Sequence, residues 1–312
     1  MALRQVLDIV DLLDRPEING EDIAELFSSR GLVGMIVEPV ETELGSTTFL
    51  KLVLPGTEGR TVGGGAPTIG IIGFLGGVGA RPEVVGLVSD GDGAVTALSA
   101  GLKLVDMYAL GDRLPGDIIL TTHVSPNAPV RPHEPVPFMG SPVGMEEMCE
   151  RLVDPHMDAI LSIDTTKGNR IINTRGFAIS PTVKEGYVLR VSESLLSLQE
   201  WVTGRPPAVF AVTTQDITPY ANELYHLNSI LQPATVTDVP VVGVAITAET
   251  AVPGCASGAS HEVDIEVAAR FVVEVSKAYT SGRAVLYDQE EFDRLVRLYG
   301  TMSYLQAPRR VK

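Results

Sequence analysis

Residues 86–123, which read GLVSDGDGAVTALSAGLKLVDMYALGDRLPGDIILTTH, decide the fold. The apolar run 84–88 ends in the acidic turn SDGDG at 89–93. Apolar residues then recur at helical spacing (Val95, Leu98, Leu102, Val105 and Met107) and predict a helix with one buried stripe. Gly111 closes that helix, and the strand 118–121 leads to His123. This order predicts a βαβ unit, and open parallel sheets bind ligands at the carboxyl ends of their strands.

The composition excludes several classes of protein. The chain has 312 residues, 45% of them apolar, which is enough for a large core and too apolar for general disorder. Its net charge is −15, and basic residues cluster only in the last few positions, so we expect no nucleic-acid partner. Two cysteines fit a reducing compartment. Because no signal peptide and no run of about 20 apolar residues is present, we expect a cytoplasmic protein without a membrane partner.

Predicted buried strands alternate with predicted helices along the chain. This alternation predicts a three-layer α/β/α domain around a mixed, mostly parallel sheet. We expect one domain over residues 1–312, with a core at about 20–280 and with the N-terminal helices, the C-terminal helix and a basic tail appended. The predicted helices span residues 3–13, 20–30, 95–110, 145–152, 195–202, 262–279 and 290–298. The predicted strands span residues 33–40, 47–54, 68–74, 118–121, 159–163, 208–212, 228–232 and 239–246.

A proline-rich segment follows His123. Six prolines lie between residues 125 and 144, and they exclude both a helix and a central strand there. The segment starts at the carboxyl end of a strand, so we expect a rigid loop that roofs a site at this end of the sheet.

Polar residues recur where the predicted strands end. They are Asp90, Asp92, His123, Asp164 and Asp216, with His261 just before a long helix. Carboxylates and imidazoles gathered at one edge of a sheet are the ligand set of a divalent metal such as zinc or manganese. Helix capping is the alternative for the aspartates, and burial as hydrogen-bonded polar groups is the alternative for the histidines. Their shared position at strand ends favours a site.

The order of these segments resembles the zinc-dependent aminopeptidases and deacylases with co-catalytic metals. Asp90 in SDGDGA stands where that superfamily has the aspartate that bridges two metals. Asp164 in AILSIDTTKG matches the next acidic ligand, and His261 in GASHEVDIE matches the last histidine. The segment TTQDITPY, with Asp216 and Tyr220, is similar to a segment near that site. The resemblance covers about residues 20–280 and implies a zinc-exopeptidase-like fold; the closer likeness is to a bacterial family of unassigned function with a degenerate metal site.

Two departures from the superfamily pattern bear on its chemistry. Its first strand ends in H-x-D, whereas this chain has IIGFLGG, with Phe74 and Gly76 and no ligand. Thr122 and His123 stand where the superfamily has a pair of glutamates, one of them the general base. The resemblance therefore implies that one metal site is lost or rebuilt and that the standard base is missing.

The leading hypothesis is a metal-dependent hydrolase that acts on an amide or peptide-like small substrate. The resemblance implies zinc or manganese held by four ligands, namely Asp90, His123, Asp164 and His261. Asp92 is a candidate to orient an imidazole, and a base would come from His123 or from the proline-rich loop, at His133 or Glu134. Two alternatives stay open. One is a catalytically degenerate relative that binds a peptide or small molecule, and the other is a non-hydrolytic enzyme on the same scaffold.

Other candidates carry weaker signals. Lys167 and Arg170 follow Asp164 and are candidates to bind a substrate carboxylate, with a solvated turn as the alternative. Cys255 has small neighbours that would expose a nucleophile beside His261, but a lone cysteine is more often a small buried hydrophobe. We also expect a homo-oligomer.

Overall fold

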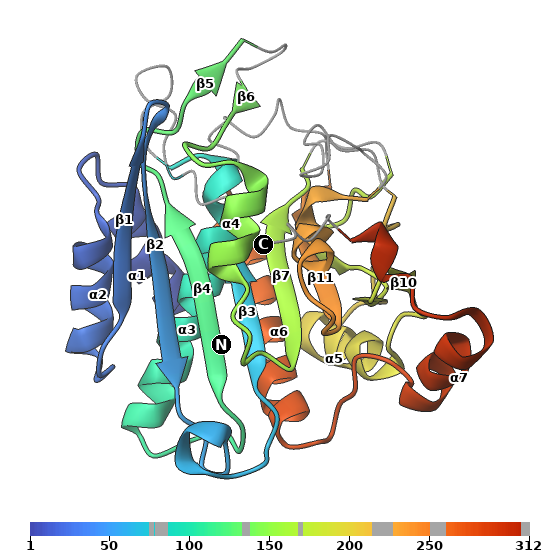
Figure 1. Cartoon of the computed structure of the whole chain (residues 1–312). Helices are drawn as coiled ribbons and strands as arrows, with labels where there is room; N and C mark the ends of the chain where they lie inside the picture. Colours follow the sequence, from blue (N-terminus) through green and yellow to red (C-terminus); the bar gives the residue numbers. More distant parts are fainter. Residues whose placement is uncertain are drawn as a thin grey trace.

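A mixed sheet of nine strands forms the centre of the part of the chain that the computed structural model describes, residues 1–74, 78, 87–132, 138–167, 171–213, 227–249 and 260–306. The strand order is β1-β2-β4-β3-β7-β11-β9-β10, and β8 also pairs with β11. The strands are β1 (Ile36–Thr42), β2 (Gly45–Leu54), β3 (Ile69–Gly73), β4 (Ile118–Val124), β7 (Ala159–Thr165), β8 (Gly176–Ile179), β9 (Val183–Lys184), β10 (Tyr187–Val188) and β11 (Val241–Thr247). The central strands β4, β3, β7 and β11 are parallel, and the outer pairs are antiparallel (Figure 1).

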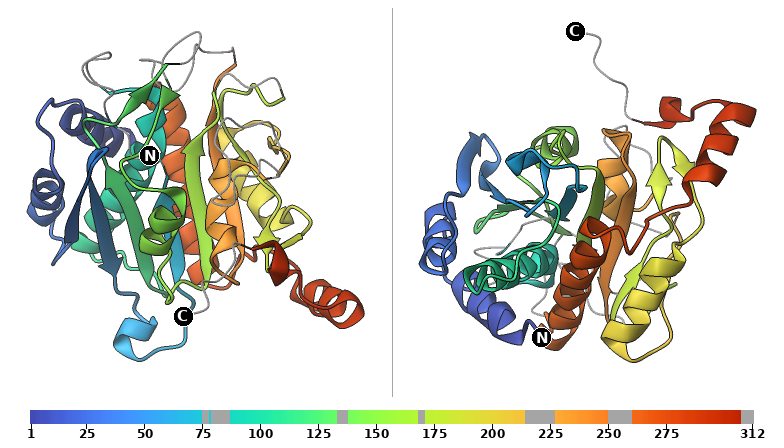
Figure 2. Two further views of the ribbon diagram at one scale, coloured as in Figure 1. Left: turned by 45° about the horizontal axis from the view of Figure 1, so that its top comes forward. Right: turned by 90° about the horizontal axis from the view of Figure 1, so that it is seen from below.

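Helices cover both faces of this sheet, as the sequence predicts. They are α1 (Leu3–Leu13), α2 (Gly20–Ser29), α3 (Asp92–Ala109), α4 (Met145–Leu152), α5 (Glu193–Thr203), α6 (Glu262–Thr280) and α7 (Gln289–Tyr299). In Figure 2, α3, α5 and α6 lie on one face and α4 lies on the other. The fold is therefore the expected three-layer α/β/α arrangement.

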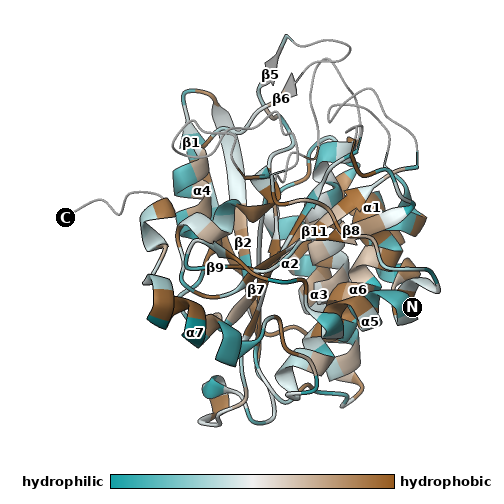
Figure 3. Ribbon diagram, turned by 90° about the vertical axis from the view of Figure 1, so that its right-hand side faces the viewer, coloured by the Kyte–Doolittle hydropathy of each residue, from teal (hydrophilic) through white to brown (hydrophobic). Residues whose placement is uncertain are grey.

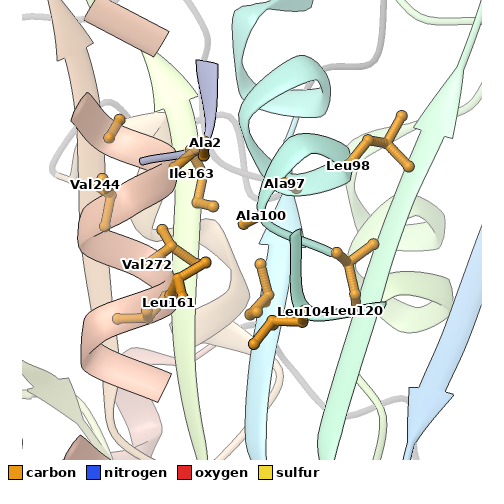
Figure 4. Close-up of a cluster of buried hydrophobic side chains, with 14 of the residues drawn as sticks. Ala2, Ala97, Leu98, Ala100, Leu104, Leu120, Leu161, Ile163, Val244 and Val272 are labelled. Atoms are coloured by element: carbon orange, nitrogen blue, oxygen red, sulfur yellow. The ribbon is translucent and has the colours of Figure 1, made fainter. Parts of the chain in front are cut away.

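The larger apolar core lies between the sheet and the pair α3 and α6. Side chains of α3, such as Ala97, Ala100 and Leu104, meet Leu161 of β7 and Val272 of α6 there (Figure 4). The sequence predicts one buried stripe on this helix, but nearly all of α3 between residues 92 and 105 is buried. The prediction is wrong because α1 and α6 flank α3 and cover its outer sides.

A second apolar cluster lies on the other face, under α4. It joins Ile72 and Ile119 of the sheet to Met148 and Leu152 of the helix. At the C-terminal side α7 packs mainly through the buried Phe292, and apolar and hydrophilic residues alternate along it (Figure 3). In the described part of the chain no helix is long and apolar enough to cross a membrane.

Two predicted strands are wrong. Residues 208–212 contribute one isolated bridge, between Val209 and Ile179, and no strand. Residues 229–232 belong to the 3₁₀ helix η3 (Ser229–Thr235), and Asn228 is its N-cap. The side chain of Asn228 accepts a hydrogen bond from the backbone N–H of Ile230, which caps the turn, and Pro233 lacks the N–H that a central strand requires.

The segments around the organising βαβ unit also differ from expectation. Leu87 and Val88 are not in a strand, and the rest of the run 84–88 lies outside the described residues. The strand that precedes α3 is β3, so the unit is β3-α3-β4 with parallel strands. The proline-rich segment contains a two-stranded sheet, β5 (Val130–Arg131) with β6 (Phe138–Met139), where the sequence predicts only a loop. This pair is a separate two-stranded sheet and not part of the central sheet. Prolines are tolerated in such edge strands.

Candidate functional site

The carboxyl ends of β4, β3 and β7 meet at one edge of the sheet. The register aligns Thr122, Gly73 and Ile163 across these strands. The next residue of each strand is His123, Phe74 or Asp164. Because successive side chains point to opposite faces of a sheet, these three form a row on the other face from Thr122 and Ile163. All three are buried, and Phe74 belongs to the apolar cluster under α4. The aromatic ring of Phe74 therefore comes from the strand between the strands of His123 and Asp164.

Gly93 allows the first turn of α3 to pack directly against this edge. A Cβ atom at residue 93 would lie 2.5 Å from the carbonyl oxygen of Phe74 and 2.7 Å from that of Ile163. Only glycine permits this approach of a helix to two strand ends. The close contact places the preceding 3₁₀ turn η2 (Ser89–Gly91), with Asp90, and the first helical residue, Asp92, over the edge of the sheet.

Asp92 is the centre of a buried hydrogen-bonded group. Its Oδ2 atom lies 2.5 Å from Nζ of Lys167, and its Oδ1 atom accepts a hydrogen bond of 2.6 Å from the hydroxyl of Ser260. The side chains of Asp92 and Lys167 are 0% and 2% exposed. Burial raises the pKa of Asp92 above its ordinary value, against the opposing attraction of the Lys167 ammonium. An ammonium group thus lies beside this carboxylate in a water-poor site.

His123 is held as a neutral imidazole. Its Nδ1 atom lies 3.0 Å from the hydroxyl of Thr47, which donates a 3.0 Å hydrogen bond to the carbonyl oxygen of Val124. Because the hydroxyl proton is used in that bond, Nδ1 of His123 carries its own proton and donates to Thr47. The ring stacks on Phe49 with centroids 5.4 Å apart. Burial lowers the pKa of His123 to about 4, so the ring is uncharged at neutral pH.

The other predicted ligands occupy different surroundings. Asp90 and Asp164 are buried, and Oδ1 of Asp164 accepts a 2.7 Å hydrogen bond from the backbone N–H of Thr165. His261 immediately precedes α6, its side chain is 56% exposed, and its Nδ1 atom lies 3.4 Å from Asp264. The edge of the sheet therefore combines three buried aspartates, Asp90, Asp92 and Asp164, with an exposed histidine at the start of a helix.

The resemblance implies a metal site built from four side chains. Within the described ranges, no three His, Cys, Asp or Glu side chains are grouped so that they could hold one. Lys167 and Ser260 engage the Asp92 carboxylate, and Thr47 engages Nδ1 of His123. The ligand set of Asp90, His123, Asp164 and His261 therefore stays a prediction. The further predicted residues His133, Glu134, Arg170, Asp216, Tyr220 and Cys255 lie outside the described residues.

Sequence reasoning missed two members of this edge. Ser260 reaches Asp92 across 168 positions of the chain, and Thr47 reaches His123 across 76. No local pattern marks either contact, because both are made by the packing of distant strands and helices. Lys167 was a candidate to bind a substrate carboxylate, and here it binds the carboxylate of Asp92.

The sequence matches the model of a known protein family. Residues 38–309 match the family model described as "Protein of unknown function (DUF1177)". The chain belongs to this family. No curated protein matches the sequence of this DUF1177 chain.

The fold of the DUF1177 chain is shared with solved enzymes. The bottromycin maturation enzyme BotP in complex with Mn has a TM-score of 0.53 and 15% identity, covering 90% of this chain and 71% of that chain. An Acidobacteriales bacterium glutaminyl cyclase has a TM-score of 0.51 and 12% identity, covering 90% and 94%. The Legionella pneumophila LapA aminopeptidase has a TM-score of 0.49 and 10% identity, covering 89% and 71%. The predicted likeness to a family of unassigned function is confirmed by the family match, and the fold shared with BotP and with the glutaminyl cyclase confirms the predicted α/β fold. Identities this low show the fold alone.

Proposed function

We propose that the carboxyl end of the central sheet binds an amide or peptide-like small molecule without hydrolysing it. The observation that carries this proposal is the buried Asp92–Lys167 pair at the carboxyl end of a sheet whose fold is shared with the bottromycin maturation enzyme BotP. Buried charge pairs contribute little net stability, so their presence at the ligand-binding edge of an open α/β sheet favours a functional role. Carboxylates such as Asp90 and Asp164 accept hydrogen bonds from amide N–H groups and from ammonium groups, which is the chemistry of a peptide-like ligand.

The absence of hydrolysis is argued from the groups that the edge presents. Thr122 stands at the position where the superfamily has its general base, and its hydroxyl donates a 2.9 Å hydrogen bond to the carbonyl of Gly73. A neutral hydroxyl is too weak a base to take a proton from water. Loss of a general base typically lowers the rate about 10²–10⁴-fold. Lys167 supplies a positive charge next to Asp92, so the carboxylate needs no metal cation to balance it.

The decisive experiment combines metal content, turnover and ligand binding on the same preparation. We expect protein purified without chelator to contain no stoichiometric zinc or manganese. A panel of aminoacyl and N-acyl amides should give no turnover with added zinc, manganese or cobalt, and at least one amide should raise the melting temperature. Asp164→Asn should weaken that binding, while Asp293→Asn on α7 is a matched control that should not. If no amide binds to the wild-type protein, the proposal is wrong.

The second candidate is the metal-dependent hydrolase. The shared fold with BotP, which was solved in complex with Mn, favours it. In this case Asp90, His123, Asp164 and His261 would be the ligands of zinc or manganese, and the DUF1177 chain would act on an amide or peptide-like substrate. Stoichiometric metal that is lost in both Asp90→Asn and His261→Gln, together with metal-dependent amide turnover, would establish this candidate and overturn binding without hydrolysis.

A further inference from the structure

A cavity of about 310 Å³ lies at the other end of the same strands. Its floor is made by Val53 of β2 and Ile119 of β4, on the face of the sheet that carries α4. That helix is only eight residues long and ends at Leu152, whose carbonyl accepts a hydrogen bond from Thr121. Because α4 ends there, it does not cover the amino ends of β3 and β4. Loop residues line the cavity at this place instead. The volume is at the lower end of the range of small-molecule sites, about 300–1,000 Å³.

In each of two ion pairs around this cavity the cation is more exposed than the carboxylate. Lys51 pairs with Asp154, and Nη2 of Arg60 lies 2.5 Å from Asp158. The side chain of Asp154 is only 9% exposed, whereas those of Lys51 and Arg60 are 31% and 52% exposed. The fifth charged residue, Asp117, is buried and accepts three hydrogen bonds, from Gly56 N–H at 2.7 Å and from the N–H and hydroxyl of Thr61 at 3.0 and 2.7 Å. Asp117 is thus buried and the side chain of Asp154 nearly so, both are hydrogen-bonded, Asp158 is 27% exposed and paired with Arg60, and in each ion pair the cation is the more exposed partner.

Thr68 adds a buried hydroxyl group to the cavity. It precedes β3, lines the cavity and is 1% exposed. Within the described chain its Oγ1 atom has no hydrogen-bond partner. A buried hydroxyl left in this state is unfavourable, and a ligand atom in the cavity would satisfy it.

We propose that this cavity is a binding site for a small aliphatic carboxylate. The guanidinium of Arg60 and the ammonium of Lys51 attract the carboxylate, the hydroxyl of Thr68 donates to the ligand, and the apolar body covers Val53 and Ile119. Arginine and lysine are the side chains that bind carboxylates, and charge-assisted hydrogen bonds are stronger than neutral ones. This site shares no residue with the carboxyl end of the sheet, so it stands or falls independently of the function proposed there.

The charge requirement is tested with three ligands of one shape on the full-length protein. Isovalerate carries a carboxylate, isovaleramide is neutral and isoamylamine is a cation. Calorimetric titration should show binding of isovalerate and at least tenfold weaker binding of the other two. If isovalerate does not bind, or if the three ligands bind equally, the proposal is overturned.

Two variants with matched controls locate the site. Thr68→Val keeps the shape of the side chain and removes the hydroxyl, so it should weaken isovalerate binding about tenfold. Thr96→Val is its control, because Thr96 also has a buried hydroxyl without a partner but lies in α3. Arg60→Gln should weaken binding by a similar factor, and Arg190→Gln, an exposed ion-paired arginine elsewhere, should not. Wild-type affinity in both Thr68→Val and Arg60→Gln would overturn the assignment.

Discussion

The two ends of the central strands hold similar ion pairs in very different surroundings. At the carboxyl end Asp92 and Lys167 are almost completely buried, whereas at the amino end Arg60 is half exposed where it meets Asp158. A charge pair away from water interacts strongly and leaves a costly unpaired charge if one partner is removed. A pair in contact with water contributes little. The carboxyl end should therefore depend on each partner, and the amino end should leave its cations available to a ligand.

The largest effect should come from removing the buried ammonium. Lys167→Met leaves the Asp92 carboxylate without its counter-charge, so we expect a loss of about 3–5 kcal/mol in the free energy of unfolding at pH 7. Urea denaturation measures it. The equivalent change at the other end, Lys51→Met, removes a partly exposed cation and should cost less than about 1 kcal/mol. Equal losses in the two variants would contradict the comparison.

His123 should make the carboxyl end sensitive to acid. The folded state holds the pKa of His123 at about 4, below the ordinary value of 6.5, because the ring is buried. As pH falls from 6.5 to 4 the unfolded chain takes up a proton that the folded chain does not, so stability decreases over this range. The full difference corresponds to roughly 3 kcal/mol. Unfolding measured from pH 7 to 4 should show a shallower loss for His123→Gln than for the wild type.

His156 provides the matched control at the amino end. Its side chain is 73% exposed and bonds to Asp154 in the loop between α4 and β7. His156→Gln should leave the slope of stability against pH close to that of the wild type. If His123→Gln and His156→Gln change the slope alike, burial of His123 is not the cause.

The contact that positions Asp92 should be sensitive to a single methyl group. Gly93→Ala places a Cβ atom against two backbone carbonyls, so α3 must shift away from the ends of β3 and β7. We expect a loss of about 1–3 kcal/mol in thermal or urea unfolding. Gly65→Ala is the control at a glycine with open space around it, and it should be close to neutral. A neutral Gly93→Ala would show that the helix is not seated as tightly as the structure indicates.

The smallest effect on stability should come from the rim of the amino-end cavity. Arg60→Gln removes an exposed ion pair with Asp158 and should change the free energy of unfolding by less than about 1 kcal/mol. Differential scanning fluorimetry is sufficient for this comparison. A loss as large as that of Lys167→Met would mean that the cations of this end serve the fold rather than a ligand.

Sequence patterns predicted much of the fold because most of its elements carry a strong local signal. The helix α4 was predicted with its observed bounds, and β3 is one residue shorter at each end than predicted. The pattern of residues 228–232 predicts a strand wrongly, because a short apolar run fits a strand and a 3₁₀ turn equally well, and the Asn228 cap selects the turn. The single buried stripe predicted for α3 failed because the sequence does not reveal which helices flank it.

The sequence by itself determined where the polar residues of the candidate site stand along the chain. Asp90, Asp92, His123 and Asp164 were identified because they follow apolar runs, a pattern that depends only on neighbouring residues. Only the tertiary structure decided what they touch. Lys167 and Ser260 meet at Asp92 from distant segments, and Phe74 comes from the strand between those of His123 and Asp164. The order of the strands and the packing of α3 against their ends bring these groups together. Both arise from long-range packing that no local spacing encodes.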